Sequence, residues 1–406
     1  MSRILKIRFI FILGLIIQLS LVTCEKDNQE PVIDDCNPAG VAGELLSSSF
    51  VGTFTPAQVQ TFAGALGVPV SMELTYTVDA YTMTYETRDK NDALTIASGV
   101  IFVPRGIDTL DLLSVQHGTI IKRSEVGSQL PYYAADGLIS AMNGYLVASP
   151  DYLGLGVSDL LHPYLHAELS ANAVIDMIRA TRIHACQSEL LLSDRLFLAG
   201  YSEGGYVTLA TQQAIEMDYA DEFQLTAVAP MAGPYDLLGS TETMLKRKTY
   251  DNPSYLAYLV TAYNDIYEWD RLAEIFEEPF ASRIPRLFNG NYSGSDIHDS
   301  LTTEIDSLFQ EQFRVSFLTG NETQIEAALI ENSPLNWGPI APVRLYHGTS
   351  DSTVYFENSQ TAFESMQKNG GLDVGLVPLN GANHETGAFP SYYLALTWFE
   401  SLRNTP

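Results

Sequence analysis

The amino-acid sequence predicts an α/β protein in which helices flank a mainly parallel sheet. From residue 111 onward, short and continuously apolar segments alternate with helical patterns, and such segments are typical of parallel strands covered on both faces. Before residue 104 the apolar residues instead recur at every second position, which indicates antiparallel strands. With 46% hydrophobic and 17% charged residues among 406, the chain has enough apolar material for a large core.

The expected elements follow this division of the chain. Alternating apolar side chains predict one or two antiparallel strands over residues 72–87 and a further strand over 94–103. The later expected strands are 111–116, 145–149, 195–199, 226–230, 343–346 and 375–378. Between them, apolar residues at helical spacing predict helices over 164–185 and 204–216.

Residues 237–336 interrupt this alternation. They contain no convincing strand pattern and are rich in aromatic residues, so we interpret them as a helical cap inserted between two late strands. The core is then formed by residues 41–236 and 337–406. A single domain with an insertion accounts for a length that by itself would suggest two or three domains.

Residues 1–23 resemble a secretory signal peptide. Three basic residues precede an apolar run at 9–22, which is shorter than the ~20 residues that a membrane-spanning helix needs. The tetrapeptide that ends at Cys24 resembles a bacterial lipobox, in which the cysteine becomes the lipid-modified first residue. The alternative is ordinary cleavage nearby, with Cys24 as a spare thiol.

Residues 24–40 are predicted to form a flexible tether. Their polar and acidic start resembles the export tags of surface lipoproteins in Bacteroidetes. The expected location is therefore the cell envelope, as an outer-membrane lipoprotein that faces the exterior, and otherwise the secreted fraction. The membrane is reached through the lipid on Cys24.

The charge balance points away from nucleic acid as a partner. Lys and Arg total 22 against 49 Asp and Glu, a formal net charge of −27. Binding through phosphates is not expected of so acidic a chain. Removal of residues 1–23 takes away three positive charges and no negative one, so the mature chain carries a net charge near −30.

Three cysteines are too few for a disulfide scaffold. If Cys24 carries lipid, Cys36 and Cys186 remain. They form either a disulfide that fastens the N-terminal segment to the body in an oxidising compartment, or two free thiols. The sequence leaves both alternatives open.

Residues 200–204 (GYSEG) match the pattern G-x-S-x-G, with an apolar strand before them and a helical pattern after them. This is the context of a nucleophile elbow, a sharp turn that holds the serine in a strained conformation and exposes its Oγ. The predicted nucleophile is Ser202. The N–H of Glu203, at the start of the helix, is predicted to face the developing oxyanion.

A serine nucleophile needs a base and an acid that orients the base, and in this context the chain order is Ser, then Asp or Glu, then His. His384 follows the last strand and is the only histidine beyond Asp351, which lies in a G-x-x-D-x-x-V loop after the preceding strand. His347 precedes Asp351 and therefore has the wrong order for the base. Asp373 is the fallback acid.

A second oxyanion donor is expected from the loop after strand 111–116. Gly118 permits close approach of the backbone to a ligand, and the N–H of Thr119 is the predicted donor beside that of Glu203. The side chain of His117 fits a packed loop residue as well as it fits a substrate contact.

With these motifs, the chain from about Glu73 to Arg403 resembles secreted lipases and esterases of the α/β-hydrolase superfamily, particularly the fungal secretory lipase group and its bacterial relatives. Apart from the Ser, Asp and His motifs, the shared feature is the segment 149–156 (SPDYLGLG) after a strand, followed by a helix with Asp176. The resemblance implies an α/β-hydrolase fold with a helical lid between the sixth and seventh sheet strands, where 237–336 falls.

The remaining polar motifs predict no metal and no cofactor. His162 and His166 stand four apart on an expected helix start, which is a metal-ligand spacing, but no third ligand lies nearby. No phosphate-binding glycine loop or dinucleotide fingerprint is present. Asp151 is expected to be a structural carboxylate that accepts hydrogen bonds from loop N–H groups.

Together these observations predict a serine hydrolase that cleaves a small-molecule carboxylic ester, as a lipase or esterase, through an acyl-enzyme. The ester is of acyl, phenolic or acetylated-sugar type. A serine exopeptidase of the same fold is the first alternative, although too few residues precede the core for the β-propeller of such enzymes. A non-catalytic surface protein that binds lipid or glycan is the second, and the intact Ser202, Asp351 and His384 argue against it.

Overall fold

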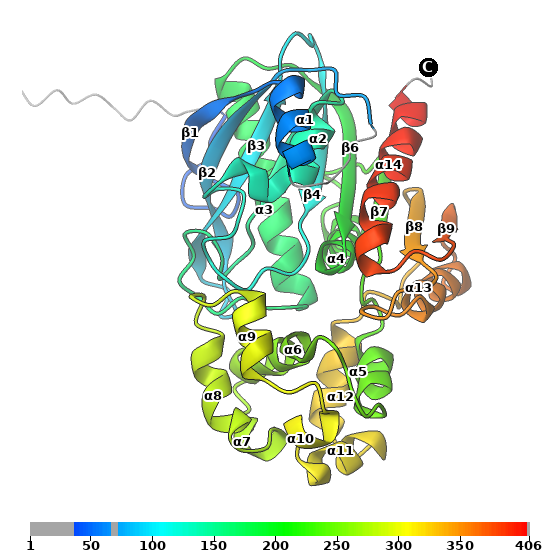
Figure 1. Cartoon of the computed structure of the whole chain (residues 1–406). Coiled ribbons are helices and arrows are strands. Elements are labelled where there is room, and N and C mark those ends of the chain that lie inside the picture. Colours follow the sequence, from blue (N-terminus) through cyan, green and yellow to red (C-terminus); the bar gives the residue numbers. More distant parts are fainter. Residues whose placement is uncertain (1–35, 66–71, 404–406) are drawn as a thin grey trace, which may run out of the picture. The chain divides into compact units, whose positions relative to one another are not determined.

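The computed structural model describes residues 36–65 and 72–403. The expected signal peptide (1–23), Cys24 and most of the expected tether lie outside these residues. From Cys36 onward, the described chain forms one compact unit. It contains a nine-stranded sheet covered by helices on both faces, and a group of helices beyond one edge of these layers (Figure 1).

The sheet has the strand order β1-β2-β3-β5-β4-β6-β7-β8-β9. Pairing is antiparallel from β1 through β3 to β5 and parallel from β5 through β4 to β9. The strands are β1 (Leu45–Phe54), β2 (Val78–Arg88), β3 (Leu94–Pro104), β4 (Leu110–Gln116), β5 (Tyr145–Pro150), β6 (Leu192–Tyr201), β7 (Ala227–Met231), β8 (Val343–Gly348) and β9 (Val374–Leu379). The predicted α/β class, with an antiparallel start and a parallel body, is confirmed.

The antiparallel start differs from the prediction in two places. The segment 72–87 contains a single strand that begins only at Val78, because the N–H groups of Thr75 and Tyr76 donate to the carbonyl oxygen of Met142 instead of to a strand. Its partner β1 was not predicted. Most side chains of β1 are exposed and three consecutive residues are serines, so this edge strand lacks the apolar alternation that predicts strands.

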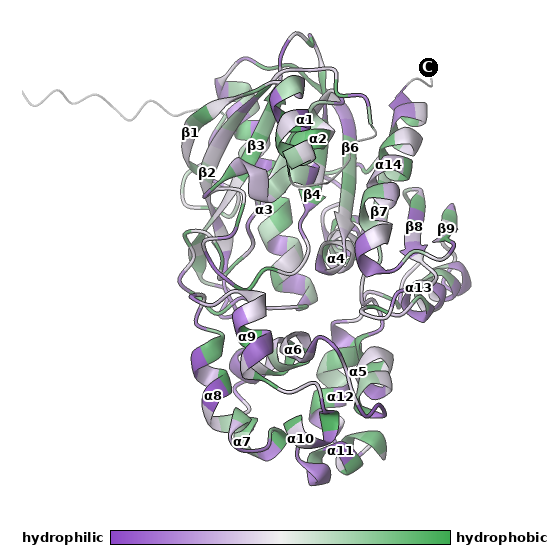
Figure 2. Cartoon of the chain, viewed as in Figure 1, coloured by the Kyte–Doolittle hydropathy of each residue, from purple (hydrophilic) through white to green (hydrophobic). Residues whose placement is uncertain are grey.

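Helices cover both faces of the sheet, which explains why the central strands β4, β5 and β7 are buried along their whole length. Figure 2 shows that the covering helices carry both hydrophobic and hydrophilic residues. Successive residues of β3 enter two separate cores, Val100 and Phe102 on one face and Ile101 and Val103 on the other. The helices are α1 (Pro56–Ala65), η1 (Pro131–Ala134), α2 (Ala135–Ala141) and α14 (His384–Arg403) on the first face, and α3 (Ala167–Gln187), α4 (Glu203–Asp218) and α13 (Glu357–Lys368) on the second.

The chain between β7 and β8 is helical. Its elements are α5 (Leu237–Leu245), α6 (Pro253–Ile266), α7 (Leu272–Ile275), α8 (Phe280–Leu287), α9 (Gly294–Ser300), α10 (Ile305–Leu308), α11 (Glu311–Leu318) and α12 (Thr323–Glu331). We call this group the cap. Figure 1 shows it as a separate layer, with α5, α6, α9 and α12 on the side that faces the core. In this part of the described chain, β pairing is limited to two isolated bridges.

A buried group of hydrogen bonds attaches the cap to the core. Asn332, just after α12, accepts the N–H of Ala167 at the start of α3 (2.8 Å) and the hydroxyl of Tyr206 on α4 (2.7 Å). Tyr263 on α6 donates to the carbonyl oxygen of Leu165 (2.8 Å). Two core helices and two cap helices therefore share one polar junction, which fixes the base of the cap.

A disulfide fastens the beginning of the described chain to the core. Cys36 is bonded to Cys186 near the end of α3, with their Cα atoms 6.1 Å apart, so the disulfide alternative is correct. Asn37 next to it exchanges hydrogen bonds with the backbone of Leu45 at the start of β1 (2.9 and 3.1 Å). Residues 36–40, which the sequence assigns to the tether, thus begin at a fixed point. None of the described helices is long and apolar enough to cross a membrane.

We expect the substitution Cys186→Ser to lower the free energy of unfolding by roughly 2–4 kcal/mol, because a disulfide across 150 residues restricts the unfolded chain strongly. Urea denaturation of protein made under oxidising conditions measures this. Adding a reductant provides the control, since it should bring the wild type to the value of the variant and leave the variant unchanged. A loss below about 0.5 kcal/mol would contradict the prediction.

Candidate active site

The turn between β6 and α4 holds Ser202 in a strained conformation. Its φ is 61° and its ψ is −124°, and α4 begins at the next residue, Glu203. The glycines of the motif allow this turn. A Cβ on Gly200 would lie 2.3 Å from the carbonyl oxygen of Gly204, and a Cβ on Gly204 would lie 2.0 Å from that of Gln116. The turn thus requires glycine on both sides of Ser202.

The structure brings Ser202, His384 and Asp351 together in one chain of hydrogen bonds. His384 Nε2 lies 2.8 Å from Ser202 Oγ, and His384 Nδ1 lies 2.6 Å from Asp351 Oδ2. A carboxylate can only accept, so Nδ1 carries the proton and Nε2 is free to accept from the hydroxyl. The imidazole is therefore in the tautomer that a general base for Ser202 needs.

Two close backbone contacts set the position of His384, the first residue of α14. Tyr201, beside the nucleophile, donates its hydroxyl to the carbonyl oxygen of His384 (2.7 Å). A Cβ on Gly348, at the end of β8, would lie 2.3 Å from the carbonyl oxygen of Ala382. The loop that carries Asp351 and the loop that leads to His384 are thus packed directly against each other.

Several groups besides His384 stabilise Asp351 as an anion. The N–H groups of Thr353 and Val354 donate to Oδ1 at 2.9 Å each, and His347 Nε2 lies 3.3 Å from Oδ2. Burial raises the pKa of Asp351. Hydrogen bonds from His347 and His384, together with the positive charges of these rings when protonated, lower the pKa by more, so that it falls to about 2. The carboxylate therefore stays ionised at neutral pH.

His347 was not predicted as a site residue. It was considered only as the base, and its place before Asp351 excluded it. Its Nε2 donates to the carbonyl oxygen of Val354 (2.9 Å), so its Nδ1 accepts from the hydroxyl of Ser359 (2.7 Å). The sequence did contain a signal for this supporting role, namely a histidine at the end of β8, four residues before Asp351. The fallback acid, Asp373, instead forms a surface ion pair with Arg344 (2.8 Å).

The loop after β4 lies against the nucleophile. A Cβ on Gly118 would lie 3.6 Å from Ser202 Cβ, so the backbone that leads to Thr119 passes beside the serine. The hydroxyl of Thr119 forms a hydrogen bond with that of Tyr164 (3.0 Å). On the other side, the N–H of Glu203 belongs to the first turn of α4 and has no acceptor within its own helix. The two predicted oxyanion donors therefore flank Ser202.

His117 and Asp151, two further polar loop residues with predicted roles, make structural contacts. His117 places its ring nitrogens 2.7 and 3.2 Å from the carbonyl oxygens of Gly118 and Asp151, which favours a packed loop residue. The carboxylate of Asp151 accepts from the hydroxyl of Ser98 (2.6 Å) and the N–H of Ser128 (3.2 Å). Asp151 thus holds two loops together, as expected of a structural carboxylate.

His162 and His166 do not share a ligand position. The helix α3 begins at Ala167 and not at residue 164, because His166 forms its N-cap and accepts the N–H of Leu169. His162 lies in the preceding loop, with Nε2 2.7 Å from Glu203 Oε1. Among the described residues, no group of three His, Cys, Asp or Glu side chains could hold a metal ion.

A pocket opens beside the nucleophile, between the core and the cap; we call it the Ser202 pocket. It is lined by Tyr164, Leu165, Ser202, Glu203, Pro234, Leu237, Ser240, Thr241, Met244, Tyr250, Tyr255, Leu256, Leu259, Thr353 and Val354. Most of these side chains are apolar or aromatic. Ser202 is polar, and its hydroxyl is hydrogen-bonded to His384.

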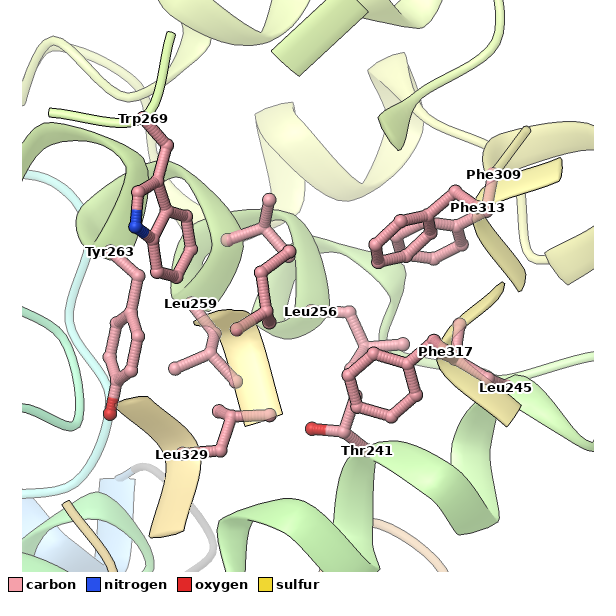
Figure 3. A pocket seen from close by; sticks show the side chains of 12 residues that line it. Thr241, Leu245, Leu256, Leu259, Tyr263, Trp269, Phe309, Phe313, Phe317 and Leu329 are labelled. Atoms are coloured by element: carbon pink, nitrogen blue, oxygen red, sulfur yellow. The ribbon is translucent and has the colours of Figure 1, made fainter. Parts of the chain in front are cut away.

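A second pocket lies inside the cap and adjoins the first; we call it the cap pocket. Its lining is Thr241, Leu245, Leu256, Leu259, Val260, Tyr263, Trp269, Phe309, Phe313, Phe317, Ile325 and Leu329. Figure 3 shows phenylalanine rings on one side, Tyr263 and Trp269 on the other, and leucines between them. Thr241, Leu256 and Leu259 line both pockets, so these three side chains lie between the Ser202 pocket and the cap pocket.

The fold and this arrangement of Ser, His and Asp are those of the α/β-hydrolases. Residues 134–404 match the family model of the secretory lipases, which is more than half of the chain, and the protein belongs to that family. It is a carboxylic ester hydrolase. No curated protein sequence matches the chain.

Solved structures agree with this assignment. A protein of Legionella pneumophila superposes with a TM-score of 0.83 at 26% identity, covering 89% of this chain and 98% of that one. The rice cell wall degrading esterase LipA of Xanthomonas oryzae superposes with a TM-score of 0.78 at 29% identity over 91% and 98%. Candida antarctica lipase A, at 15% identity over 90% and 84%, shares the fold with a TM-score of 0.67.

The lowered pKa of Asp351 predicts how acid affects stability. Because its pKa in the folded protein, about 2, lies below the ordinary 3.8, its contribution to stability is complete above about pH 4 and is lost as the pH falls through 2. The difference in unfolding free energy between wild type and Asp351→Asn should therefore shrink by about 2 kcal/mol between pH 5 and pH 2. Urea denaturation over this range measures it, and a difference independent of pH would contradict the prediction.

Proposed function

We propose that the protein is a secreted, lipid-anchored serine esterase or lipase that hydrolyses acyl esters through Ser202, His384 and Asp351. The observation that carries this proposal is the chain of hydrogen bonds from Asp351 through His384 to Ser202, at the wall of an apolar pocket. A strained, half-buried serine at a pocket wall, with an oriented imidazole beside it, is the arrangement that acyl transfer requires.

The proposed reaction has two steps. Ser202 Oγ attacks the ester carbonyl while His384 Nε2 takes its proton, and the imidazolium then gives that proton to the leaving alcohol. The Asp351 carboxylate, 2.6 Å from Nδ1, stabilises the imidazolium. Water, activated by the same imidazole, releases the acid from the acyl-enzyme. The N–H groups of Glu203 and Thr119 hold the oxyanion in both steps, and each should contribute roughly 3 kcal/mol to lowering the barrier.

The apolar surface favours an acyl ester among the possible substrates. The alkyl chain of the acyl group would pass Leu256 and Leu259 from the Ser202 pocket into the cap pocket, whose lining offers almost only carbon atoms. Each methylene buried there should strengthen binding by about 0.8 kcal/mol. The related LipA is described as degrading cell walls, so phenolic and acetylated-sugar esters remain the comparison substrates for this chain.

The proposed location is the outer surface of the cell envelope. The supporting features are the signal-like residues 1–23, the lipobox-like Cys24 and the polar segment that follows, together with membership of a secretory family. A body with a net charge near −30 is repelled by anionic headgroups. Attachment would therefore depend on the lipid, and a single acyl chain binds only marginally, so several chains on Cys24 are required.

Ser202→Ala is expected to lower kcat/KM for p-nitrophenyl butyrate by roughly 10⁴-fold, because the acyl-enzyme can no longer form. The matched control is Ser365→Ala on α13, which removes a hydroxyl that donates to the carbonyl oxygen of Leu335 and should keep at least about half of the activity. Both variants should melt within a few degrees of the wild type. Substantial hydrolysis by well-folded Ser202→Ala protein would overturn the assignment of the nucleophile.

Leu259→Phe should narrow the passage between the two pockets, since Leu259 lines both. Hydrolysis of p-nitrophenyl laurate should fall roughly tenfold relative to p-nitrophenyl acetate, because only the long chain needs the cap pocket. Leu318→Phe, in a cap helix but outside both pocket linings, provides the control and should leave the ratio unchanged. An equal effect of Leu259→Phe on both esters would argue against an acyl chain in the cap.

A further inference from the structure

An acidic side chain is buried directly beside the nucleophile. Glu203, the residue after Ser202, has a side chain that is 0% exposed. Its Oε1 lies 2.7 Å from Nε2 of His162, whose side chain is 1% exposed. Its Oε2 has no hydrogen-bond partner within the described residues. A carboxylate is expensive to bury unless it is paired, so the contact with His162 must account for its charge.

The hydrogen bonds of His162 determine how many protons the pair carries. Its Nδ1 lies 2.7 Å from the carbonyl oxygen of Leu153, which can only accept, so Nδ1 is protonated. One further proton must then lie between Nε2 and Glu203 Oε1, because neither a bare carboxylate nor a bare ring nitrogen donates. Whichever of the two atoms holds this proton, the pair as a whole is electrically neutral.

Among the described residues, no other side chain forms a hydrogen bond with the Glu203 carboxylate. The rings of Tyr152, Tyr164 and Tyr258 lie 5.9, 6.1 and 5.6 Å from that of His162. Burial raises the pKa of these phenols and of those of Tyr206 and Tyr255, and the Glu203 charge raises it further, so all are neutral. The guanidinium of Arg123 bonds instead to the loop carbonyl oxygens of Gly154, Asp159 and Leu160.

We propose that His162 is a positioning and charge-compensating residue of the ester-hydrolysing site, which keeps the Glu203 side chain neutral as a pair and immobile beside the oxyanion. This inference rests on the proposed function. The backbone N–H of Glu203 is a proposed oxyanion donor, and an unpaired carboxylate on the same residue would repel the negative charge that develops on the substrate oxygen. In a dry site such repulsion is weakly screened and acts on the transition state more than on the neutral ester.

The pair also fixes the geometry of the elbow. His162 belongs to the loop that begins at Asp151, and Gly154 approaches its backbone so closely that a Cβ there would lie 2.2 Å from His162 N. Because Tyr152 in the same loop donates to the carbonyl oxygen of His117 (3.1 Å), one loop contacts both the Glu203 and the Thr119 sides of the oxyanion site. His162 thus connects the two proposed donors through a single rigid segment.

The test compares His162→Gln, Glu203→Gln and the double variant, with active-site concentration determined from the initial burst of p-nitrophenol. His162→Gln removes the imidazole that compensates Glu203, so an ionised Glu203 is left unpaired, and kcat for p-nitrophenyl acetate should fall about 30-fold while KM changes less than about threefold. Glu203→Gln removes the charge and should reduce kcat by only about threefold. The double variant should recover to the level of Glu203→Gln.

His166→Gln is the matched control. It makes the same substitution in the same loop, but within the described residues no carboxylate bonds to His166, and burial lowers its pKa to about 4, so no charge is lost. It should retain kcat within about twofold. If His162→Gln does not fold, His162→Asn replaces it in the series.

Recovery in the double variant supports the proposal, because a merely structural loss would not be repaired by a second substitution. A double variant as slow as His162→Gln, or a His162→Gln enzyme as fast as the wild type, would overturn it. Failure of the proposed function is a separate result, in which the wild type itself neither hydrolyses the ester nor shows a burst.

Discussion

The close approach of α4 to β4 determines the conformation of Ser202. Because a Cβ on Gly204 would lie 2.0 Å from the carbonyl oxygen of Gln116, the helix can pack here only with glycine, and the chain must turn within one residue after β6. That residue is Ser202, and the turn requires its strained φ of 61°. The strain is held by the two cores on either face of the sheet, and it puts Oγ within 2.8 Å of His384.

Each neighbour of the nucleophile has a second role in the same geometry. Tyr201 fixes the backbone of His384 through its hydroxyl, and Glu203 is tied through His162 to the loop that supports the other side of the site. His347 and two N–H groups keep Asp351 ionised although it is buried. Ser202, His384 and Asp351 are thus already oriented toward one another in the folded chain, and such preorganisation is the condition for electrostatic stabilisation of a transition state.

The sequence predicts the fold well, because the central parallel strands β4, β5, β7 and β8 are almost wholly buried and their apolar runs are unambiguous. It places Ser202, Asp351 and His384 through local turn chemistry and chain order, and the structure brings these three together. It does not predict β1, whose exposed serines carry no hydrophobic period. Supporting contacts such as His162 with Glu203 join residues 41 apart, and no local pattern encodes a pairing that arises only when loop and helix pack.

The cap illustrates a further limit of sequence reasoning. Aromatic richness predicts a cap, but it does not predict that Thr241, Leu256 and Leu259 contribute to the linings of both the Ser202 pocket and the cap pocket. The buried junction at Asn332 joins cap and core by hydrogen bonds that form only in the folded chain.

The proposal that Ser202 is the nucleophile of an acyl-enzyme can be tested through a covalent adduct. The protein is treated with a fluorophosphonate, digested, and mapped by mass spectrometry. We expect a single phosphonyl adduct on the peptide that contains Ser202, and we expect it to disappear when His384 is replaced by Ala. An adduct on another residue, or an unmodified Ser202 in protein that hydrolyses esters, would show that Ser202 is not the nucleophile.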